Sequence, residues 1–409
     1  MNLAAAAADR DAADPLSGFR SRFSIPDPDL VYLDGNSLGP LPRRTRTAIA
    51  ETVDREWAGG LVRSWDRWLD LGTRAGAALA PLIGARPDEV ALCDQTSVNL
   101  YKLAEAAIGA EPSRPDIVTD ADNFPSDRYI LHEVARRRGG RLRDVPADPT
   151  VTDIADALDQ HVGLVSLSLV NYRSGALADL RGITALAHQA GARVLWDLSH
   201  AAGIVPVDLA DADLAVGCTY KYLNGGPGSP AFLYVRRDLQ GTLTQPIAGW
   251  WSHDDMFAFE AGYRPAPDIR RFLTGTAPIV SMIGAAEGIA LCADAGIDAI
   301  RAKSRTMTSW FIELANQRLA ALGFEMVTPT DDDRRGGHVA LRHDAAWPIV
   351  QALRDRNVIV DFRHPGIVRY GFSPLYNRYR DVAAAIERTA DVVASGRHEA
   401  YPDAPAAVT

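Results

Sequence analysis

The fold of this chain is decided by VLWDLSHAAGIVPVDLADADLAVGCTYKYLNGGPGSPAFLYV, the stretch from Val194 to Val235. Two of its apolar runs, Val194–Trp196 and Leu214–Cys218, are short and continuous, which is typical of buried strands in a parallel sheet. Asp197 directly follows the first run, and Lys221 follows the second after a Thr-Tyr pair. Because ligands bind at the carboxyl ends of strands in an open α/β sheet, we expect this acid and this amine to meet in one crevice.

A glycine-rich segment, Asn224–Gly228, separates the lysine from a third apolar run, Ala231–Val235. Its glycines allow another group to approach the backbone closely. An isolated Asp and Lys near strand ends more often form a structural ion pair, but such a pair needs no glycines beside it. Pyridoxal phosphate uses both groups, because a lysine carries it covalently and an acid keeps its pyridinium nitrogen protonated. The sequence therefore predicts that Lys221 carries pyridoxal 5'-phosphate and that Asp197 binds its ring nitrogen.

The segments DLSHAAGIVPVDL and GCTYKYLNGGPGSPAF resemble the core of the kynureninases, which are pyridoxal-phosphate enzymes of the aspartate-aminotransferase fold. DLSHAAG alone is shared with cysteine desulfurases, so the specificity of the match comes from further motifs, which follow one another in order along nearly the whole chain. These motifs are YLDGNSLGPLP at Tyr32–Pro42, GGLVRSW at Gly59–Trp65, NFPSD at Asn123–Asp127, GWWSH at Gly249–His253, GTAPI at Gly275–Ile279 and VRYGFSPLYN at Val368–Asn377.

The resemblance implies an α/β fold of type I, class V aminotransferase-like, with a mostly parallel sheet flanked by helices and a smaller α+β C-terminal domain. Alternating strand and helix patterns before Ile279 agree with right-handed parallel crossovers. The expected strands there are Glu89–Cys93, Asp116–Thr119 and Leu164–Val170, and the expected helices are Arg43–Trp57, Leu71–Ile83, Val98–Ile108, Arg128–Arg138, Ile154–Asp159 and Ile183–Ala190.

After Ile279 the expected pattern changes to long helices and short strands. The expected helices are Val280–Ala293, Ile297–Leu322, Ala346–Arg356 and Asp381–Ser395, and the expected strands are Glu325–Val327, His338–Arg342, Val358–Phe362 and Ile367–Tyr370. We expect a large domain at 59–285, a small domain at 286–409 and an N-terminal segment, 1–58, that packs with the small domain. Residues 1–14 are rich in alanine and aspartate and are expected to be frayed.

Composition limits the possible partners. The 409 residues are 47% apolar and 23% charged, as in ordinary globular proteins, and the net charge of −9 argues against nucleic acid as a partner. No apolar run approaches the roughly 20 residues that cross a bilayer, so no membrane partner is expected. Cys93, Cys218 and Cys292 are widely spaced and suggest neither disulfides nor a metal site. We expect a cytoplasmic protein.

Thr96 and Ser97 stand between a strand pattern and a helix pattern. Either is a good N-cap, and capping alone explains the pair. A helix start also gathers unpaired N–H groups that bind phosphate. With the resemblance, we interpret both residues as ligands of the cofactor phosphate.

The resemblance implies several further cofactor contacts. Phe124 would stack on the ring and Asp127 would lie near it. The other implied contacts are Pro125, Ser126, Ser168, His200 and Tyr220, together with Trp250 and Thr276, which in this family complete the phosphate site of the neighbouring subunit. A homodimer is therefore expected. From the residues alone, His200 is more simply a packing or capping residue, and Pro125 and Ser126 read as the start of a helix.

Three residues are candidates for the substrate. Arg369 ends a strand pattern, where an arginine is more often a solvated surface group. An amino-acid substrate, however, needs a bidentate carboxylate clamp, and the VRYGFSPLYN match puts that role on Arg369. From the residues alone, Ser37 belongs to a plain turn-dense loop, and Trp65 belongs to an aromatic cluster of the kind that is more often part of a core. The resemblance makes both of them weaker substrate candidates, Ser37 as a contact and Trp65 near the aromatic ring of the substrate.

The implied reaction is hydrolytic Cβ–Cγ cleavage of L-kynurenine, or of 3-hydroxykynurenine, to anthranilate or 3-hydroxyanthranilate and L-alanine, in tryptophan degradation and NAD biosynthesis. Lys221 would remove the α-proton, and Tyr220 would serve either the substrate carbonyl or the phosphate. Two alternatives remain. A cysteine desulfurase would need a nucleophilic cysteine in a C-terminal loop, but the last cysteine is Cys292. A non-catalytic cofactor-binding regulator would usually carry a DNA-binding module. The sequence does not decide between the two substrates.

Overall fold

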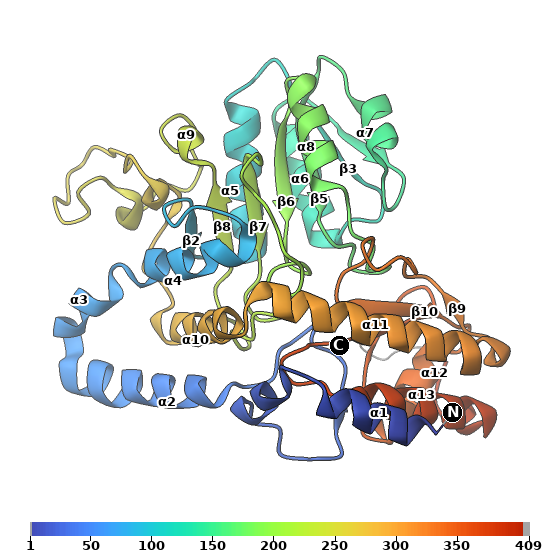
Figure 1. Ribbon diagram of the computed structural model, residues 1–409. Helices are drawn as coiled ribbons and strands as arrows, with labels where there is room; N and C mark the ends of the chain where they lie inside the picture. The colour runs from blue at the N-terminus through green and yellow to red at the C-terminus, as the bar shows by residue number, and fades with distance from the viewer. Residues whose placement is uncertain (1, 404–409) are drawn as a thin grey trace.

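The computed structural model describes residues 2–403 as two regions, each built on its own sheet (Figure 1). The larger sheet has seven strands. Their spatial order is β2 (Val90–Leu92), β8 (Phe232–Val235), β7 (Leu214–Gly217), β6 (Arg193–Asp197), β5 (Val162–Ser168), β3 (Asp116–Asp120) and β4 (Leu142–Val145). All neighbours pair in parallel except β8, which runs antiparallel to both β2 and β7. The mostly parallel sheet predicted from the sequence is therefore confirmed.

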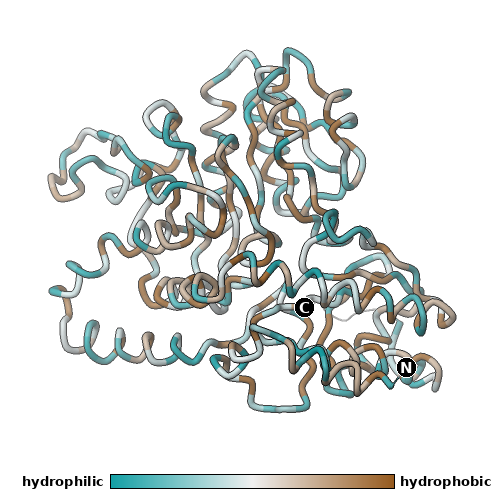
Figure 2. Tube along the Cα trace, viewed as in Figure 1, coloured by the Kyte–Doolittle hydropathy of each residue, from teal (hydrophilic) through white to brown (hydrophobic). Residues whose placement is uncertain are grey.

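The central strands are buried on both faces, which explains their continuous apolar sequences. They form the brown centre of the upper region in Figure 2. Helices α5 (Thr96–Gly109) and α6 (Pro125–Arg137) cover one face, and their buried residues share a core cluster with alternate residues of the strands. Helices α4 (Leu71–Leu79) and α8 (Leu180–Gln189) cover the other face.

This region contains further helical segments. Most of them are short or lie at its periphery, and α10 is the long exception. They are α2 (Arg43–Glu51), η2 (Thr52–Gly60), η3 (Leu61–Ser64), α3 (Trp65–Trp68), η4 (Ala80–Ile83), α7 (Val151–Ala157), α9 (Arg237–Gln240), η5 (Trp250–Ser252), η6 (Ile269–Phe272) and α10 (Ile279–Ala295). The single helix expected at Arg43–Trp57 is α2 followed by a wider π-helical segment, η2.

The smaller sheet has the order β12 (Asp361–Arg363), β13 (Ile367–Gly371), β10 (His338–Arg342) and β9 (Glu325–Met326), with antiparallel neighbours. Beside it, β1 (Val31–Tyr32) and β11 (Val358–Ile359) form a parallel pair. The expected strand Val358–Phe362 is thus two strands that serve different sheets. The helical segments here are α1 (Leu3–Ala12), η1 (Ser17–Arg22), α11 (Ile297–Arg318), η7 (Ala320–Leu322), α12 (Ala346–Arg354), α13 (Tyr379–Ala394) and η8 (Arg397–Ala400).

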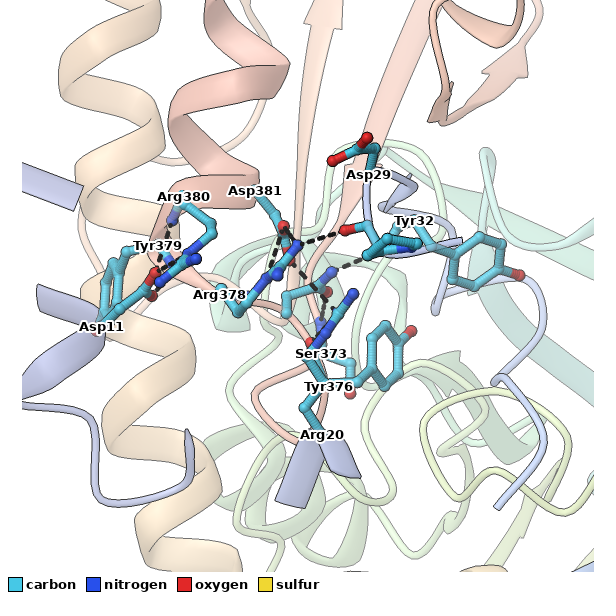
Figure 3. A network of polar contacts seen from close by, with 12 residues as sticks. Asp11, Arg20, Asp29, Tyr32, Ser373, Tyr376, Arg378, Tyr379, Arg380 and Asp381 are labelled. Carbon is cyan, nitrogen blue, oxygen red and sulfur yellow. Dashed lines mark hydrogen bonds and ion pairs between the residues drawn. The ribbon is translucent and has the colours of Figure 1, made fainter. Parts of the chain in front are cut away.

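The expectation that residues 1–14 are frayed is wrong for residues 2–14, and Met1 lies outside the described residues. Helix α1 packs along α13, and its Leu3 and Ala7 are buried in the core of the smaller region. The carboxylate of Asp11 accepts hydrogen bonds from the Tyr379 backbone N–H at 2.6 Å and from Arg380 at 2.7 Å (Figure 3). The composition suggested disorder, but an apolar pair one helical turn apart and a partner helix are enough to order the segment.

Within the described residues, no single helix is long and apolar enough to cross a membrane. Only α10 and α11, bent by 79° at the break between them, reach that length and composition together.

Candidate active site

A cavity of about 340 Å³ lies beyond the carboxyl ends of β6 and β7, where the sequence predicts the crevice. It is lined by Gln95, Thr96, Ser97, Phe124, Ser126, Asp127, Asp197, Ser199, His200, Cys218, Tyr220, Lys221, Gly228, Ser229 and Ala231. The parallel strands β5, β6 and β7 end at the same edge of the sheet, and this brings together segments that are far apart in the sequence.

Lys221 lies against a histidine in this cavity. Its Nζ is 3.2 Å from Nε2 of His200. Burial first, and the Lys221 charge next, lower the pKa of His200 well below its ordinary value, so the imidazole is neutral and its Nε2 accepts a hydrogen bond from Lys221 Nζ. Within the described residues, Lys221 forms no ion pair with Asp197. The structural ion pair considered from the sequence is therefore absent, and the acid and the amine face a shared space instead.

Two carboxyl groups form the opposite wall. Asp197 accepts a hydrogen bond from the Ser199 backbone N–H at 2.7 Å. Burial first, and the neighbouring Asp197 carboxylate next, raise the pKa of Asp127 well above its ordinary range. Oδ2 of Asp127 is buried and has no hydrogen-bond partner among the described residues. Because an unpaired buried carboxyl is costly, this wall suits a protonated ring nitrogen, which would satisfy both acids.

The third wall is the start of helix α5. Gln95 occupies the N-cap position and its side chain makes no capping hydrogen bond in the described structure, so the expectation that Thr96 or Ser97 is the N-cap is wrong by one or two residues. Thr96 and Ser97 instead form the first turn and line the cavity. Gly228, which has a φ of 71°, borders the same space. First-turn N–H groups and hydroxyls at a helix start are suited to a phosphate.

Phe124 caps the cavity on the side of α6. Its ring centroid lies 5.9 Å from Lys221 Nζ, and the ring is 38% exposed. Pro125 begins α6, as its sequence suggests, and Ser126 lines the cavity. Ser168 pairs with Asp197 across β5 and β6, and its hydroxyl donates to Asn123 Oδ1 at 2.8 Å. Ser168 therefore supports the wall from behind and is not part of the cavity lining.

Arg369 belongs to a buried polar cluster beside the cavity. It is 1% exposed, so the alternative that it is a solvated strand end is wrong. Its Nε donates to Asp361 Oδ1 at 2.7 Å, its NH2 donates to Asp361 Oδ2, and its NH1 donates to the Tyr172 carbonyl. Ser37 donates to Asp361 Oδ2 at 2.7 Å and lies 3.4 Å from Arg369 NH2. Two of the three predicted substrate residues, Arg369 and Ser37, thus share Asp361 as a partner.

Three contacts join this cluster to the cavity. The ring of His338 lies 5.9 Å from that of His200, and burial first, with Arg369 among the nearby charges, lowers the pKa of both. The Tyr172 ring meets Phe124 edge-on at 5.3 Å. The backbone N–H of Gly39 donates to the Tyr220 carbonyl at 2.8 Å. A Cβ at Gly39 would lie 2.6 Å from the Lys221 carbonyl oxygen, so only glycine allows this approach.

Three predicted site residues lie away from the cavity in the described chain. Trp65 packs against Trp68 and Trp251, with ring centroids 5.5 and 5.9 Å away. The Trp250 ring is tilted by 42° against that of Trp251, with ring centroids 5.1 Å apart, and Trp250 borders a separate surface hollow. Thr276 is exposed in the loop before α10. Within one chain, none of the three reaches Lys221.

The sequence reasoning missed several residues that the fold brings to the site. Asp361 and His338 were not predicted as site residues. Each is a single polar residue in a strand pattern, and such a pattern does not indicate which residues it will contact in the folded chain. Ser199 and Cys218, in contrast, lie within the central motifs, and their positions at strand ends were a usable signal.

Comparison with protein-family models finds a match to the kynureninase C-terminal domain over residues 300–389. The chain is 43% identical to the kynureninase of Pseudomonas fluorescens over 94% of this chain and 94% of that protein. It is 44% identical to the kynureninase of Burkholderia mallei strain SAVP1 over 95% of this chain and 94% of that protein.

Among solved structures, the apo cysteine desulfurase of Thermococcus onnurineus NA1 superposes with a TM-score of 0.79 at 20% identity, covering 95% of this chain and 98% of that one. The cystine C-S lyase C-DES, in complex with its product cysteine persulfide, gives 0.80 at 19% identity, covering 89% and 98%. At these identities the similarity establishes the fold and not the activity.

Proposed function

The chain belongs to the kynureninase family, and we propose on that premise that the cavity around Lys221 hydrolyses the Cβ–Cγ bond of L-kynurenine or its 3-hydroxy derivative, releasing anthranilate or 3-hydroxyanthranilate and L-alanine. The protein is a pyridoxal-phosphate-dependent hydrolase of a carbon–carbon bond. The observation that carries the proposal is the arrangement of Lys221, the Asp127–Asp197 wall and the start of α5 around one cavity.

The residues present fit the cofactor. Asp197 and the unpaired Oδ2 of Asp127 form a site for the ring nitrogen, Thr96 and Ser97 for the phosphate, and Phe124 for the ring face. When bound, pyridoxal phosphate supplies an electron-withdrawing ring that stabilises negative charge at the substrate Cα. Asp197 would hold the nitrogen of that ring in its protonated form.

Lys221 then acts as the base that removes the α-proton. The neutral His200 accepts a hydrogen bond from Nζ and fixes the position of the amine. The pKa of Tyr220 is raised, first by the nearby Cys218 and then by burial, so its phenol stays protonated at neutral pH. A phenol in this state donates a hydrogen bond, either to the γ-carbonyl oxygen of the substrate or to the phosphate.

Arg369 is our proposed ligand for the substrate α-carboxylate. Asp361 fixes the plane of the guanidinium group through two hydrogen bonds. The contact between Arg369 and Ser37 is long, at 3.4 Å, so it is the interaction that an incoming carboxylate would join or replace. Ser37 would bind the same carboxylate. Trp65 lies away from the cavity of its own chain, so its proposed place beside the aromatic ring of the substrate would be in the cavity of the neighbouring subunit.

We further propose a homodimer in which Trp250 and Thr276 complete the phosphate site of the neighbouring subunit. The loop that follows Trp250 exposes large apolar side chains: Phe257 is 57% exposed and Phe259 77%, and the Phe257 ring lies 6.3 Å from the Trp250 ring. Such a patch on a globular protein marks an interaction surface. A second copy that covers this patch would bring two tryptophan-rich loops to each other's cavities.

A cysteine desulfurase remains the alternative by fold. Cys218 is the cysteine that lines the cavity, but burial raises its pKa, so it is a thiol and not a nucleophilic thiolate. No observation favours a regulator.

We propose a cytoplasmic location, which is supported by Cys93, Cys218 and Cys292, since all three are buried and form no disulfide in the described structure. The proposed pathway is tryptophan degradation with NAD biosynthesis. The proposed domain limits remain 1–58, 59–285 and 286–409.

The test of the proposal is the reaction itself. Purified protein with pyridoxal phosphate is expected to release fluorescent anthranilate from L-kynurenine, and borohydride is expected to fix the cofactor on Lys221. Lys102 serves as an internal control, because it is buried and held by Asp94 at 2.6 Å and by the Phe272 carbonyl at 2.7 Å. Labelling of Lys102, or no product from L-kynurenine and 3-hydroxykynurenine, would contradict the assignment.

A further inference from the structure

Lys102 on α5 is a buried cation that the mechanism does not use. Its side chain is fully buried. Its Nζ donates to Asp94 Oδ2 at 2.6 Å, to the Phe272 carbonyl at 2.7 Å and to Cys93 Sγ at 3.6 Å. An ammonium has three N–H donors, so each of them has a partner here, and the lysine holds the Asp94 carboxylate in one orientation.

Asp94 connects this lysine to the start of α5. It stands between β2 and α5, and its φ of 47° lies in the left-handed region that residues other than glycine rarely occupy. Such a backbone persists only where its surroundings impose it. The Asp94 carbonyl accepts from the N–H of Ala231, a residue of the cavity lining, at 3.0 Å. Asp94 thereby fixes the point at which the chain enters α5, whose first turn is the proposed phosphate site.

The second oxygen of the same carboxylate binds a different loop. Asp94 Oδ1 accepts a hydrogen bond from the Thr274 hydroxyl at 2.8 Å. Thr276, two residues further along that loop, is one of the residues proposed to serve the neighbouring subunit. One carboxylate therefore contacts both the entrance of α5 and the loop that carries Thr276.

Thr274 also holds the loop of Trp250, the other residue proposed to serve the neighbouring subunit. Its carbonyl accepts a hydrogen bond from the Trp251 backbone N–H at 3.2 Å. A Cβ at Gly249 would lie 2.2 Å from the Thr274 carbonyl oxygen, so only glycine allows the two loops to approach this closely. Both loops are thus attached, through the Thr274 hydroxyl, to the entrance of α5.

We propose that Asp94 is a positioning residue that orients two parts of the cofactor phosphate site at once. It orients the first turn of α5 for the cavity of its own chain and, through Thr274, the two loops that serve the cavity of the neighbouring subunit. Lys102 keeps the carboxylate in place and balances its charge, which would otherwise repel a phosphate at the start of the same helix. This role rests on the proposed two-chain phosphate site. Its consequence is that loss of the Thr274 hydroxyl weakens cofactor binding in the neighbour's cavity and not in its own.

The test uses mixed dimers in which only one chain can be labelled. Borohydride is expected to fix the cofactor on Lys221, so a Lys221→Ala chain is silent. The labelled fraction, followed against the concentration of added pyridoxal phosphate, then reports the affinity of the cavity in the other chain. This readout does not require turnover.

Two dimers place the same changes in opposite arrangements. In the first, a Thr274→Val chain is paired with Lys221→Ala in about tenfold excess, so the labelled cavity belongs to the chain with the changed loop. In the second, a wild-type chain is paired with the same excess of a chain that carries both changes, so the labelled cavity receives the changed loop from its neighbour. A general loss of stability affects both dimers alike.

We expect the cofactor concentration at half labelling to rise by roughly five- to tenfold in the second dimer, as for the loss of one hydrogen bond. In the first dimer it should equal that of the wild type paired with Lys221→Ala. Thr274→Ser, which keeps the hydroxyl, should restore the affinity in the second dimer. Weakening in the first dimer, or none in the second, would overturn the proposal.

Thr276→Ala in the same two arrangements separates this proposal from the one on which it rests. If Thr276→Ala weakens neither labelled cavity, the two-chain phosphate site is wrong and the role of Asp94 falls with it. If Thr276→Ala weakens only the neighbour's cavity while Thr274→Val weakens neither, the shared site stands and only the role of Asp94 is overturned.

Asp94 itself is tested with Asp94→Gly, which adopts a positive φ freely but lacks the carboxylate. We expect it to weaken the labelled cavity in both arrangements. The matched control is Glu105→Gln, which removes another buried carboxylate of α5, paired with Arg138 at 2.7 Å, and should weaken neither. If Asp94→Gly does not fold, the Thr274→Val dimers still decide. Weakening by Asp94→Gly in only one arrangement, or in neither, would show that Asp94 does not couple the two parts of the site.

Discussion

At the scale of single residues, the site depends on two carboxyl groups placed side by side. Asp127 carries a raised pKa because it is buried and because Asp197 is next to it. When both acids are ionised, their negative charges repel each other, and a positive group between them relieves this repulsion. This pair therefore favours the protonated form of the ring nitrogen, and with it the electron sink that the reaction needs.

Replacing Asp197 with Asn tests that role. The variant keeps the shape of the wall but loses the charge that holds the proton on the ring. We expect kcat to fall by roughly 10²–10³, with a much smaller loss of cofactor absorbance, because the start of α5 and Phe124 are untouched. Asp156→Asn on exposed α7 is the control. Near-normal turnover of Asp197→Asn would contradict the pyridinium role.

At the scale of elements, η1 and the start of α13 are joined by polar contacts around Asp381 (Figure 3). Asp381 is 1% exposed; it accepts from the Arg378 backbone N–H at 2.8 Å, pairs with the Arg378 side chain at 2.7 Å and lies 3.7 Å from Arg20. Arg20 in turn donates to the Tyr376 carbonyl at 2.6 Å. The chain around η1 is thus tied to the segment that follows Arg369.

Replacing Asp381 with Ala is expected to destabilise the protein. It removes the cap of α13 and leaves Arg378 and Arg20 without their carboxylate, and hydrogen bonds to charged groups contribute about 1.5–3 kcal/mol each. We expect the free energy of unfolding in urea to fall by about 2–4 kcal/mol. Asp403→Ala, at an exposed position near the C-terminus, should change it by less than about 0.5 kcal/mol. An equal effect of both substitutions would show that the contacts contribute nothing.

At the scale of the whole molecule, one chain does not bring Trp250 and Thr276 to its own cavity, whereas Lys221 and both acids are already in place. Our proposal that a neighbouring subunit supplies them makes each site a product of two chains. The exposed apolar patch near the same loop is the surface that would bury on pairing.

Mixed dimers test this proposal directly. Lys221→Ala and Trp250→Ala are each expected to be almost inactive, but a mixed dimer has one site with an intact lysine and an intact tryptophan. Random reassociation of equal amounts is expected to restore about a quarter of the wild-type activity. The control pair is Lys221→Ala mixed with Asp197→Asn. Lys221 and Asp197 line the same cavity of one chain, so every site in a mixed dimer carries one of the two changes, and no activity should be restored. Failure of the first pair to recover would show that Trp250 does not serve a partner's site.

The sequence by itself determined what is local. The strand ends at Asp197 and Lys221, the glycine-rich turn and the start of α6 at Pro125 all follow from short runs of residues, because apolar continuity and turn chemistry act within a few positions. For the same reason, most strand and helix patterns match the structure within two or three residues. The family resemblance added roles for individual residues, which the local pattern alone does not supply.

Only the tertiary structure decided which distant groups meet. The Lys221–His200 contact, the Asp127–Asp197 pair and the Arg369–Asp361 fork join segments whose local sequences carry no record of their partners. The order of α1 has the same origin, since its stability comes from packing on α13 and not from its own composition. Burial and the neighbouring Asp197 set the protonation of Asp127, and both exist only once the chain has folded.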